Sequence, residues 1–145
     1  MILQAVDKDG NVMEYNTEIR SKELTILYFY PKDNTSGCTK EACYFRDNMN
    51  RLLQYAEVVG ISPDNIVSHQ KFQQKQSLNF ILVADVEHKL AEQYGVWKEK
   101  SMYGRKYMGI ERSTFVLNSQ GEVIKEWRKV KVNGHVDEVL NFLEK

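Results

Sequence analysis

Apolar runs and helical stretches alternate along the first half of the chain. Residues 24–30, LTILYFY, are rich in β-branched and aromatic side chains without polar alternation, which is typical of a strand buried on both faces of a sheet. Residues 57–61 and 80–83 predict two further strands, and residues 65–76 predict a polar helix between them. Such alternation of strands and helices is typical of an α/β fold.

Both ends of the chain carry a hairpin pattern. The turn sequence DKDGN separates the short stretches 2–6 and 12–15, and NSQG separates the stretches 113–117 and 123–127. Because Asn, Asp and Gly tolerate the backbone angles of tight turns, we expect a β-hairpin at each place. Residues 136–143 have helical periodicity and predict a final helix.

The segment before the second hairpin is polar and aromatic. Residues 89–94 predict a short helix that ends at Gly95, and residues 97–108 predict a long loop. Loops of this length often carry function. The larger side chains of this loop either pack in the ordinary way or line a substrate channel and a docking surface; they are Trp97, Tyr103, Tyr107 and Met108.

The helix after the loop PKDNTSG is predicted to begin near Cys38 and to run to about Tyr55. Its apolar side chains form one stripe that continues from Cys38. The members of the stripe are Ala42, Phe45, Met49, Leu52 and Leu53. Cys43 lies about 140° around the helix from Cys38, among polar residues. We therefore expect Cys38 to face inward and Cys43 to face water or a loop.

Length and charge limit the possible functions. The 145 residues suffice for one domain, 1–145, with a substantial core. The 20 Lys and Arg balance the 20 Asp and Glu, so the chain lacks the one-signed charge that nucleic acid or an anionic membrane surface attracts. The longest apolar run is too short to span a bilayer, and the first ten residues lack a signal-peptide pattern, so a cytoplasmic location is expected.

These elements together predict an α/β architecture with a thioredoxin-like core, in which helices flank both faces of a central mixed β-sheet. The two cysteines are too few for a structural disulfide framework or a four-cysteine zinc site. His69, His88 and His135 lie in separate polar stretches without a ligand pair. We therefore predict no metal site and expect the three histidines at the surface.

The two thiols favour a redox role. A thiol on a polar helical face is open to oxidation, whereas structural cysteines are usually buried. In a regular helix the Cα atoms of Cys38 and Cys43 would be about 8.6 Å apart, beyond the roughly 7 Å that a disulfide allows. A bond between them therefore requires the first turns of the helix to unwind.

The reactivity of Cys38 needs more than its position at the start of a helix. Backbone N–H groups at a helix N-terminus stabilise a negative charge by about 0.3–1 kcal/mol. A thiol that ionises near pH 6 requires about 3.4 kcal/mol. A fixed cation is therefore needed, and fast chemistry requires further groups that bind the transition state.

Residues 31–47, PKDNTSGCTKEACYFRD, resemble the Pro-x-x-x-Thr-x-x-Cys active-site loop of peroxiredoxins. The second cysteine five residues after the first is similar to the bacterioferritin comigratory protein, or Q-type, branch of that family. GISPD at 60–64 and YGVWKEKSMYGRKYMGIERSTFVL at 94–117 resemble the same branch. The resemblance covers nearly the whole chain and implies the peroxiredoxin version of the thioredoxin-like fold.

The resemblance assigns roles to five residues. Cys38 would be the peroxidatic cysteine, Cys43 the resolving cysteine, Thr35 a hydroxyl that contacts peroxide, Pro31 a shield over the pocket and Arg112 the fixed cation. The sequence alone leaves simpler interpretations open. Arg112 could form a surface salt bridge, Thr35 could cap the helix, and Pro31 could merely end the strand.

The implied activity is that of a thiol-dependent peroxidase, which reduces hydrogen peroxide and organic hydroperoxides. Cys38 would become a sulfenic acid, and Cys43 would condense with it to an intramolecular disulfide. Thioredoxin or a similar dithiol protein would reduce this disulfide. The resemblance implies no cofactor, and we expect a monomer.

Two other functions could use the same thiols. A thiol-disulfide oxidoreductase would typically carry C-x-x-C, and the C-x-x-x-x-C spacing here argues against it. In a non-catalytic binding module, peroxide would oxidise both thiols no faster than free cysteine. Arg46, three residues after Cys43, either pairs with Asp47 at the surface or approaches the site.

Overall fold

The computed structural model describes all 145 residues. Its strands are β1 Ile2–Val6, β2 Val12–Asn16, β3 Leu24–Phe29, β4 Ala56–Ser62, β5 Ile81–Ala84, β6 Trp97–Met102, β7 Arg105–Ile110, β8 Ser113–Leu117 and β9 Val123–Trp127. Seven of them form one sheet in the order β2-β1-β5-β4-β3-β8-β9, and β6 pairs with β7 alone. The predicted terminal hairpins, β1–β2 and β8–β9, are confirmed.

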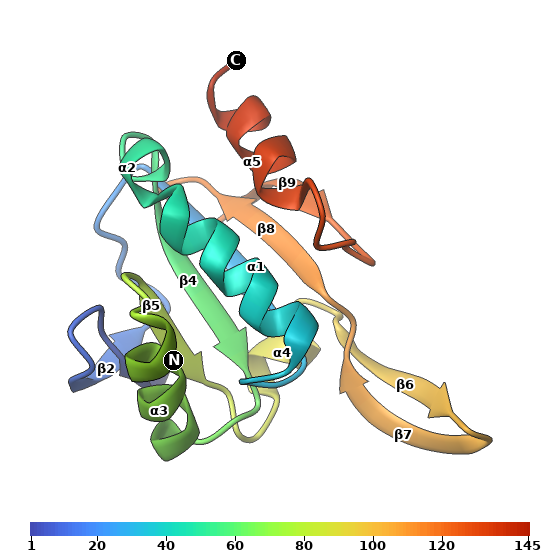
Figure 1. The fold of residues 1–145 in the computed structure, drawn as a ribbon. Helices are drawn as coiled ribbons and strands as arrows, with labels where there is room; N and C mark the ends of the chain where they lie inside the picture. The colour runs from blue at the N-terminus through green and yellow to red at the C-terminus, as the bar shows by residue number, and fades with distance from the viewer.

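The helices are α1 Ser36–Asp47, α2 Met49–Leu52, α3 Ile66–Gln76, α4 Lys89–Gln93 and α5 His135–Leu143. Figure 1 shows α1, α3 and α5 on one face of the sheet and α4 on the other. None of the helices has the length and apolarity that a membrane crossing would need.

The core has two parts, one on each face of the sheet. Ile26 and Tyr28 of β3 pack in the part that α1, α2 and α5 cover. Leu27 and Phe29, which alternate with them, pack on the opposite face with Leu90 of α4. Because successive side chains of a strand point to opposite faces, an uninterrupted apolar run serves both. The predicted mixed sheet with helices on both faces is confirmed.

The pairing of the central strands brings distant segments together. β3 runs parallel to β4, and β4 runs parallel to β5, so their carboxyl ends lie at one edge of the sheet. β8 is antiparallel to β3, with Phe29 opposite Ser113. The loop that follows β3 and Arg112, which directly precedes β8, therefore lie at the same edge.

The prediction of one long helix that reaches Tyr55 is wrong in its second half. The helix breaks at Asn48, whose backbone angles are φ −108° and ψ 10°. The Asn48 side chain donates a 2.8 Å hydrogen bond to the carbonyl of Tyr44, and this local bonding competes with regular helix. The short α2 then changes direction and leaves Leu53, predicted for the buried stripe, 41% exposed.

The prediction of a long loop at 97–108 is also wrong, because this segment forms the β6–β7 hairpin. Tyr103 and Gly104 form its tight turn with φ of 52° and 78°. Figure 1 shows the hairpin projecting from the body of the molecule. Most of its side chains are at least partly exposed to water, so its strands lack the alternation of polar and apolar residues that would have revealed them.

Candidate active site

Cys38 lies in the first turn of α1, directly after the loop at residues 31–37. Its side chain is 2% exposed, as predicted for the inward face. The preceding residue is Gly37, where a Cβ atom would lie 3.4 Å from the Arg112 side chain, at van der Waals contact. The Arg112 guanidinium therefore lies directly beside the start of the helix.

Arg112 reaches Cys38 from the neighbouring strand. Its Nη2 donates to the Cys38 sulfur at 3.2 Å, and its Nη1 lies 2.5 Å from Oε1 of Glu41. Burial disfavours the guanidinium charge, but Glu41 and Cys38 outweigh that effect and raise the pKa of Arg112. The interpretation of Arg112 as a surface salt bridge is wrong, because its ion pair is buried and its other donor points at the thiol.

Glu41 is a site residue that the sequence analysis did not predict. It lies three residues after Cys38 on α1 and is 1% exposed. Burial raises its pKa to about 7, although the charge and hydrogen bond of Arg112 act in the opposite direction. Glu41 and Cys38 therefore share one guanidinium, through its two terminal nitrogens.

Thr35 occupies the N-cap position of α1 with an extended backbone, but its side chain does not cap the helix. Its hydroxyl donates a 3.0 Å hydrogen bond to the carbonyl of Lys32 and is exposed. The hydroxyl proton is thus used in a hydrogen bond within the loop, and the oxygen lone pairs can accept a hydrogen bond from another group. Pro31 begins the same loop and is half-buried.

Cys43 lies farther along α1 and is half-buried beside the end of α3. Both cysteines are free thiols. The Cys43 sulfur lies 3.6 Å from Oε1 of Gln76. Arg46 pairs with Asp47 at 3.0 Å and donates to the carbonyl of Gln76 at 2.6 Å. Its hydrogen bonds therefore lie near Cys43, and none of them reaches Cys38.

Comparisons with known proteins bear directly on this arrangement. The AhpC/TSA family profile matches residues 3–126. Peroxiredoxin Bcp of Bacillus subtilis is 54% identical over 120 residues, which are 82% of this chain and 76% of that protein. The chain belongs to the AhpC/TSA family, in its Bcp or Q-type peroxiredoxin branch.

Two further relatives extend this similarity over almost the whole chain. Peroxiredoxin Bcp of Escherichia coli is 40% identical over 139 residues, 95% of this chain and 88% of that protein. A solved structure of Xanthomonas campestris bacterioferritin comigratory protein, from work on its alkyl peroxide reduction, has a TM-score of 0.91 at 38% identity. It covers 99% of this chain and 90% of that chain. The protein is therefore a thiol peroxidase with the thioredoxin-like peroxiredoxin fold.

A buried hydrogen-bond network holds the active-site loop of this peroxiredoxin. Asp33 accepts from the hydroxyl of Tyr30 at 2.6 Å and from Ser68 at 2.9 Å, and it lies 2.6 Å from Nδ1 of His69. The backbone N–H of Asp33 donates to Asp64. The loop before Cys38 is thereby fixed to β3 and α3. The prediction of a surface position for His69 is wrong, since its side chain is fully buried.

Asp33, Asp64 and His69 also offer potential metal-ligand atoms within 4.8 Å of one another. These atoms already bond to neighbouring protein groups, including Ser62 on Asp64 and the Val83 carbonyl on the second His69 nitrogen. The network that fixes the loop therefore accounts for their arrangement.

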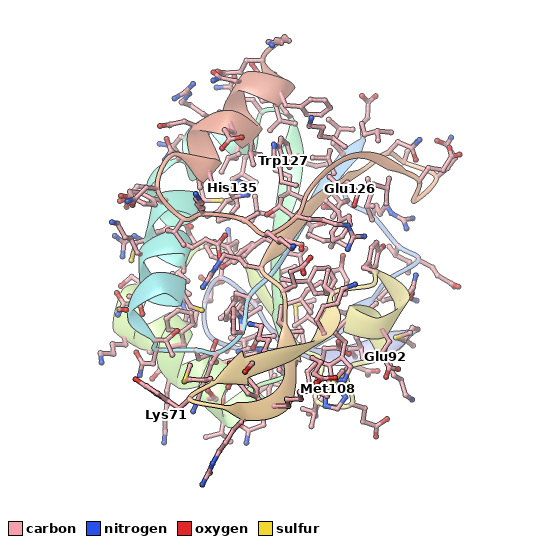
Figure 2. All side chains as sticks on the ribbon, turned by 90° about the vertical axis from the view of Figure 1, so that its right-hand side faces the viewer. Lys71, Glu92, Met108, Glu126, Trp127 and His135 are labelled. Carbon is pink, nitrogen blue, oxygen red and sulfur yellow. The ribbon has the colours of Figure 1, made fainter.

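His135 is the second histidine whose predicted surface position is wrong. It is 2% exposed, and its Nε2 lies 2.8 Å from the Thr114 hydroxyl. Burial, and then the Arg112 charge, lower the pKa of His135 to about 4. Figure 2 shows His135 beside Trp127, at the end of the molecule where α5 packs on the sheet. His135 is therefore a neutral core residue at neutral pH.

The large side chains of the β6–β7 hairpin lie in different environments. Trp97 stacks on His88 at its base, with ring centroids 3.8 Å apart. Tyr103 at the tip is 97% exposed, and Tyr107 and Met108 are also exposed. Ordinary packing therefore accounts for Trp97 and for none of the other three.

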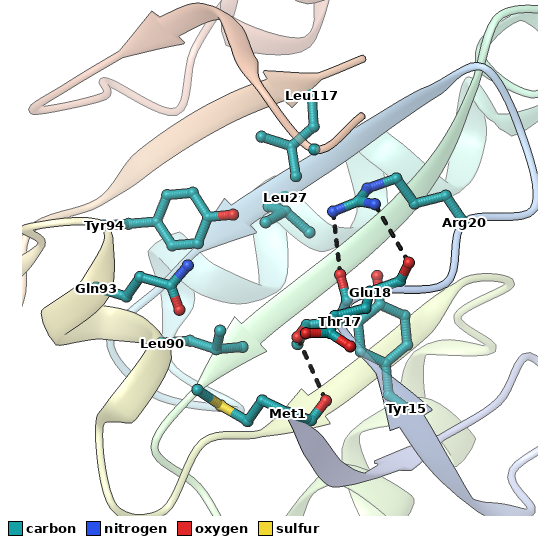
Figure 3. A pocket seen from close by; sticks show the side chains of 11 residues that line it. Met1, Tyr15, Thr17, Glu18, Arg20, Leu27, Leu90, Gln93, Tyr94 and Leu117 are labelled. Atoms are coloured by element: carbon teal, nitrogen blue, oxygen red, sulfur yellow. Dashed lines mark hydrogen bonds between the residues drawn. The ribbon is translucent and has the colours of Figure 1, made fainter. Parts of the chain in front are cut away.

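A pocket of about 290 Å³ lies away from Cys38, on the face of the sheet that includes Leu27. Figure 3 shows Arg20 at its wall, with the guanidinium donating to the carbonyls of Thr17 and Glu18. The two terminal nitrogens of Arg20 thus bond to its own segment of the chain, whereas its Nε is buried without a hydrogen-bond partner. No cysteine lines the pocket.

Proposed function

We propose that Cys38 is the peroxidatic cysteine and that Arg112 is the cation which activates it. The observation that carries this proposal is the 3.2 Å contact between Arg112 Nη2 and the Cys38 sulfur, in a buried site at a helix N-terminus. A guanidinium keeps its charge at every physiological pH. In a site of low polarity its stabilisation of a thiolate is stronger than in water.

In the first step the Cys38 thiolate attacks one oxygen of the hydroperoxide. A sulfur–oxygen bond forms, the oxygen–oxygen bond breaks, and the departing oxygen leaves as hydroxide or alkoxide, which takes up a proton. The products are a Cys38 sulfenic acid and water or an alcohol. Arg112 can stabilise both the attacking sulfur and the charge that develops on the departing oxygen.

Thr35 and Pro31 complete the peroxide site in this proposal. The Thr35 hydroxyl already donates a hydrogen bond to the backbone carbonyl of Lys32. Its oxygen can therefore accept a hydrogen bond from the peroxide O–H. This contact would orient the peroxide for attack by Cys38. Pro31 would limit access of water to the pocket from the start of the loop.

In the second step Cys43 condenses with the Cys38 sulfenic acid. The distance in a regular helix, about 8.6 Å between the Cα atoms, exceeds the disulfide limit of about 7 Å. The first turns of α1 would therefore unwind during each cycle. A thioredoxin-like dithiol protein would then reduce the intramolecular disulfide.

Hydrogen peroxide and organic hydroperoxides are the proposed substrates, since the Xanthomonas relative was studied for alkyl peroxide reduction. A single domain, a monomeric state and a cytoplasmic location are parts of the same proposal. Sedimentation of the reduced and oxidised protein measures the oligomeric state, and a dimer in both forms would contradict the expected monomer.

The proposed cycle is tested by mixing the reduced protein with one equivalent of hydrogen peroxide. We expect both thiols to disappear within seconds and the intact mass to fall by two hydrogens. In Cys43→Ser the mass should instead rise by one oxygen. Oxidation as slow as that of free cysteine would refute the proposal.

A further inference from the structure

The second half of α1 is bonded to the carboxyl end of α3, mainly through Gln76. Its side-chain Oε1 lies 3.6 Å from the Cys43 sulfur, and its backbone carbonyl accepts from Arg46 at 2.6 Å. Asn79 completes the contact by donating to the carbonyl of Arg46 at 3.3 Å. None of these bonds contributes to the Cys38 site described above.

The contact with Gln76 uses the proton of the Cys43 thiol. Oε1 of an amide has no proton, so the bond forms only when the Cys43 thiol donates its own proton. Gln76 thus engages the thiol proton of Cys43 and holds the side chain against α3 while α1 is intact.

Arg46, unlike Gln76, brings a positive charge close to Cys43. It donates to the last carbonyl of α3, where the helix dipole favours a positive charge. Its charge also interacts with the Cys43 sulfur, although the bond to Asp47 affects its pKa more strongly. Arg46 is therefore a fixed cation beside a potential thiolate.

The core shows where unwinding of α1 must stop. Phe45 is fully buried and stacks on Tyr28 with ring centroids 4.5 Å apart. Removing this ring from the core would cost several kcal/mol, far more than breaking a thiol hydrogen bond. Cys43 can therefore leave its position while Phe45 and Arg46 keep theirs.

We propose that Gln76 and Arg46 are positioning residues for the second step of the cycle. Gln76 retains Cys43 as a thiol against α3 until the first turns of α1 unwind. Arg46 stays bound to α3 and stabilises the Cys43 thiolate as it forms. This inference rests on the proposed roles of Cys38 and Cys43.

Disulfide formation between Cys43 and the Cys38 sulfenic acid needs no further reactant. The Cys43 thiolate attacks the sulfur of the Cys38 sulfenic acid, a sulfur–sulfur bond forms, and the sulfur–oxygen bond breaks. Hydroxide leaves and combines with the proton that the Cys43 thiol released, which gives water. Excess peroxide competes by oxidising the sulfenic acid to sulfinic acid.

Two variants with opposite expected effects test the proposal. Gln76→Ala removes the acceptor of the thiol proton, so disulfide formation should become about two- to fivefold faster. Arg46→Gln keeps a donor for the Gln76 carbonyl but removes the charge, so disulfide formation should become about fivefold slower. Arg46→Lys restores the charge and should recover most of the rate.

The rates follow from quench-flow experiments at increasing hydrogen peroxide, with the disulfide and the sulfinic acid quantified by mass. Gln74→Ala on the exposed side of α3 is the matched control and should match the wild type. The rate of Cys38 oxidation, measured in the same experiment, shows whether each variant keeps an intact active site.

Rate changes in opposite directions for Gln76→Ala and Arg46→Gln, with rescue by Arg46→Lys, would support the proposal. Equal rates in all variants, or slower disulfide formation in both, would overturn it. The proposed peroxidase cycle has a separate test in the same data. If the wild type forms no Cys38–Cys43 disulfide, the cycle itself fails.

Discussion

In the proposed mechanism, Arg112 is the residue on which the reactivity of Cys38 depends most directly. It comes from a position 74 residues away in the chain, yet its guanidinium contacts both the thiol and Glu41. The planar guanidinium makes these two contacts at once, whereas the single ammonium of a lysine cannot reproduce the geometry. In the proposed mechanism, both the shape and the charge of Arg112 therefore matter to the chemistry.

Arg112→Lys should lower the rate constant of Cys38 oxidation by hydrogen peroxide about a hundredfold, the usual effect of losing one transition-state donor. Quench-flow counting of free thiols at several peroxide concentrations measures this rate. Arg105→Lys in the exposed hairpin is the control and should have no effect. A rate within twofold of the wild type for Arg112→Lys would exclude the proposed role.

Glu41 makes stability depend on pH in a direction that can be worked out. Its pKa is about 7 in the folded protein, against an ordinary value of 4.5. The stability associated with its protonated form is fully present below pH 4.5 and is lost as pH rises through 7. The loss amounts to about 3 kcal/mol at most.

Glu41→Gln should therefore gain stability relative to the wild type as pH rises from 4.5 to 7, with little further gain above. Urea unfolding at pH 5, 6, 7 and 8 measures this difference. Glu138→Gln, at an exposed position of α5, should show no such trend. A constant difference between Glu41→Gln and wild type over this range would show that Glu41 ionises normally.

The sequence allowed prediction of Cys38 and Arg112 but not of their surroundings. Cys38 follows from its position at a helix start, and Arg112 follows only from the family resemblance. Glu41 was missed because a charged helical residue is normally exposed. Its spacing of three residues from Cys38, on the apolar stripe, was the available signal. His69 and His135 were misplaced because their buried partners come from distant segments.

At the level of elements, α1 is the part of the structure on which the proposed cycle depends. Its first turn carries Cys38 at the buried end, and its second turn carries Cys43 at the contact with α3. A rigid α1 would keep the two sulfurs apart. The helix must therefore be stable enough to form the peroxide site and weak enough to unwind after it reacts.

Amide hydrogen exchange should detect this unwinding. We expect the amides of residues 40–45 to exchange at least tenfold faster in the oxidised protein than in the reduced protein. The central amides of α3 should exchange equally in both forms and serve as the internal control. Equal protection of residues 40–45 in the two forms would rule out unwinding of α1.

The elements that were predicted correctly are those with one clear periodicity. Buried β3 and β4 have uninterrupted apolar runs, and α5 has a strong helical stripe. The β6–β7 hairpin was missed because two exposed strands need no apolar face. The break at Asn48 was missed because it arises from one local hydrogen bond within an otherwise continuous pattern.

At the level of the whole molecule, strand order accounts for the active site. The loop after β3, the start of α1 and the residue before β8 meet because β3 lies between β4 and β8. The sequence predicts a mixed sheet, but pairing between distant strands depends on contacts that periodicity does not encode. The strand pairing that places Arg112 beside Cys38 therefore became visible only in the structure.

The central claim is that Cys38 is the residue that attacks peroxide. The most direct measurement is to react reduced Cys43→Ser with one equivalent of hydrogen peroxide in the presence of a sulfenic-acid-trapping dione, and to map the label by peptide mass. Cys38 should carry the label in nearly all molecules, and Arg112→Lys in the same background should label far more slowly. An unlabelled Cys38 after complete consumption of the peroxide would contradict the claim.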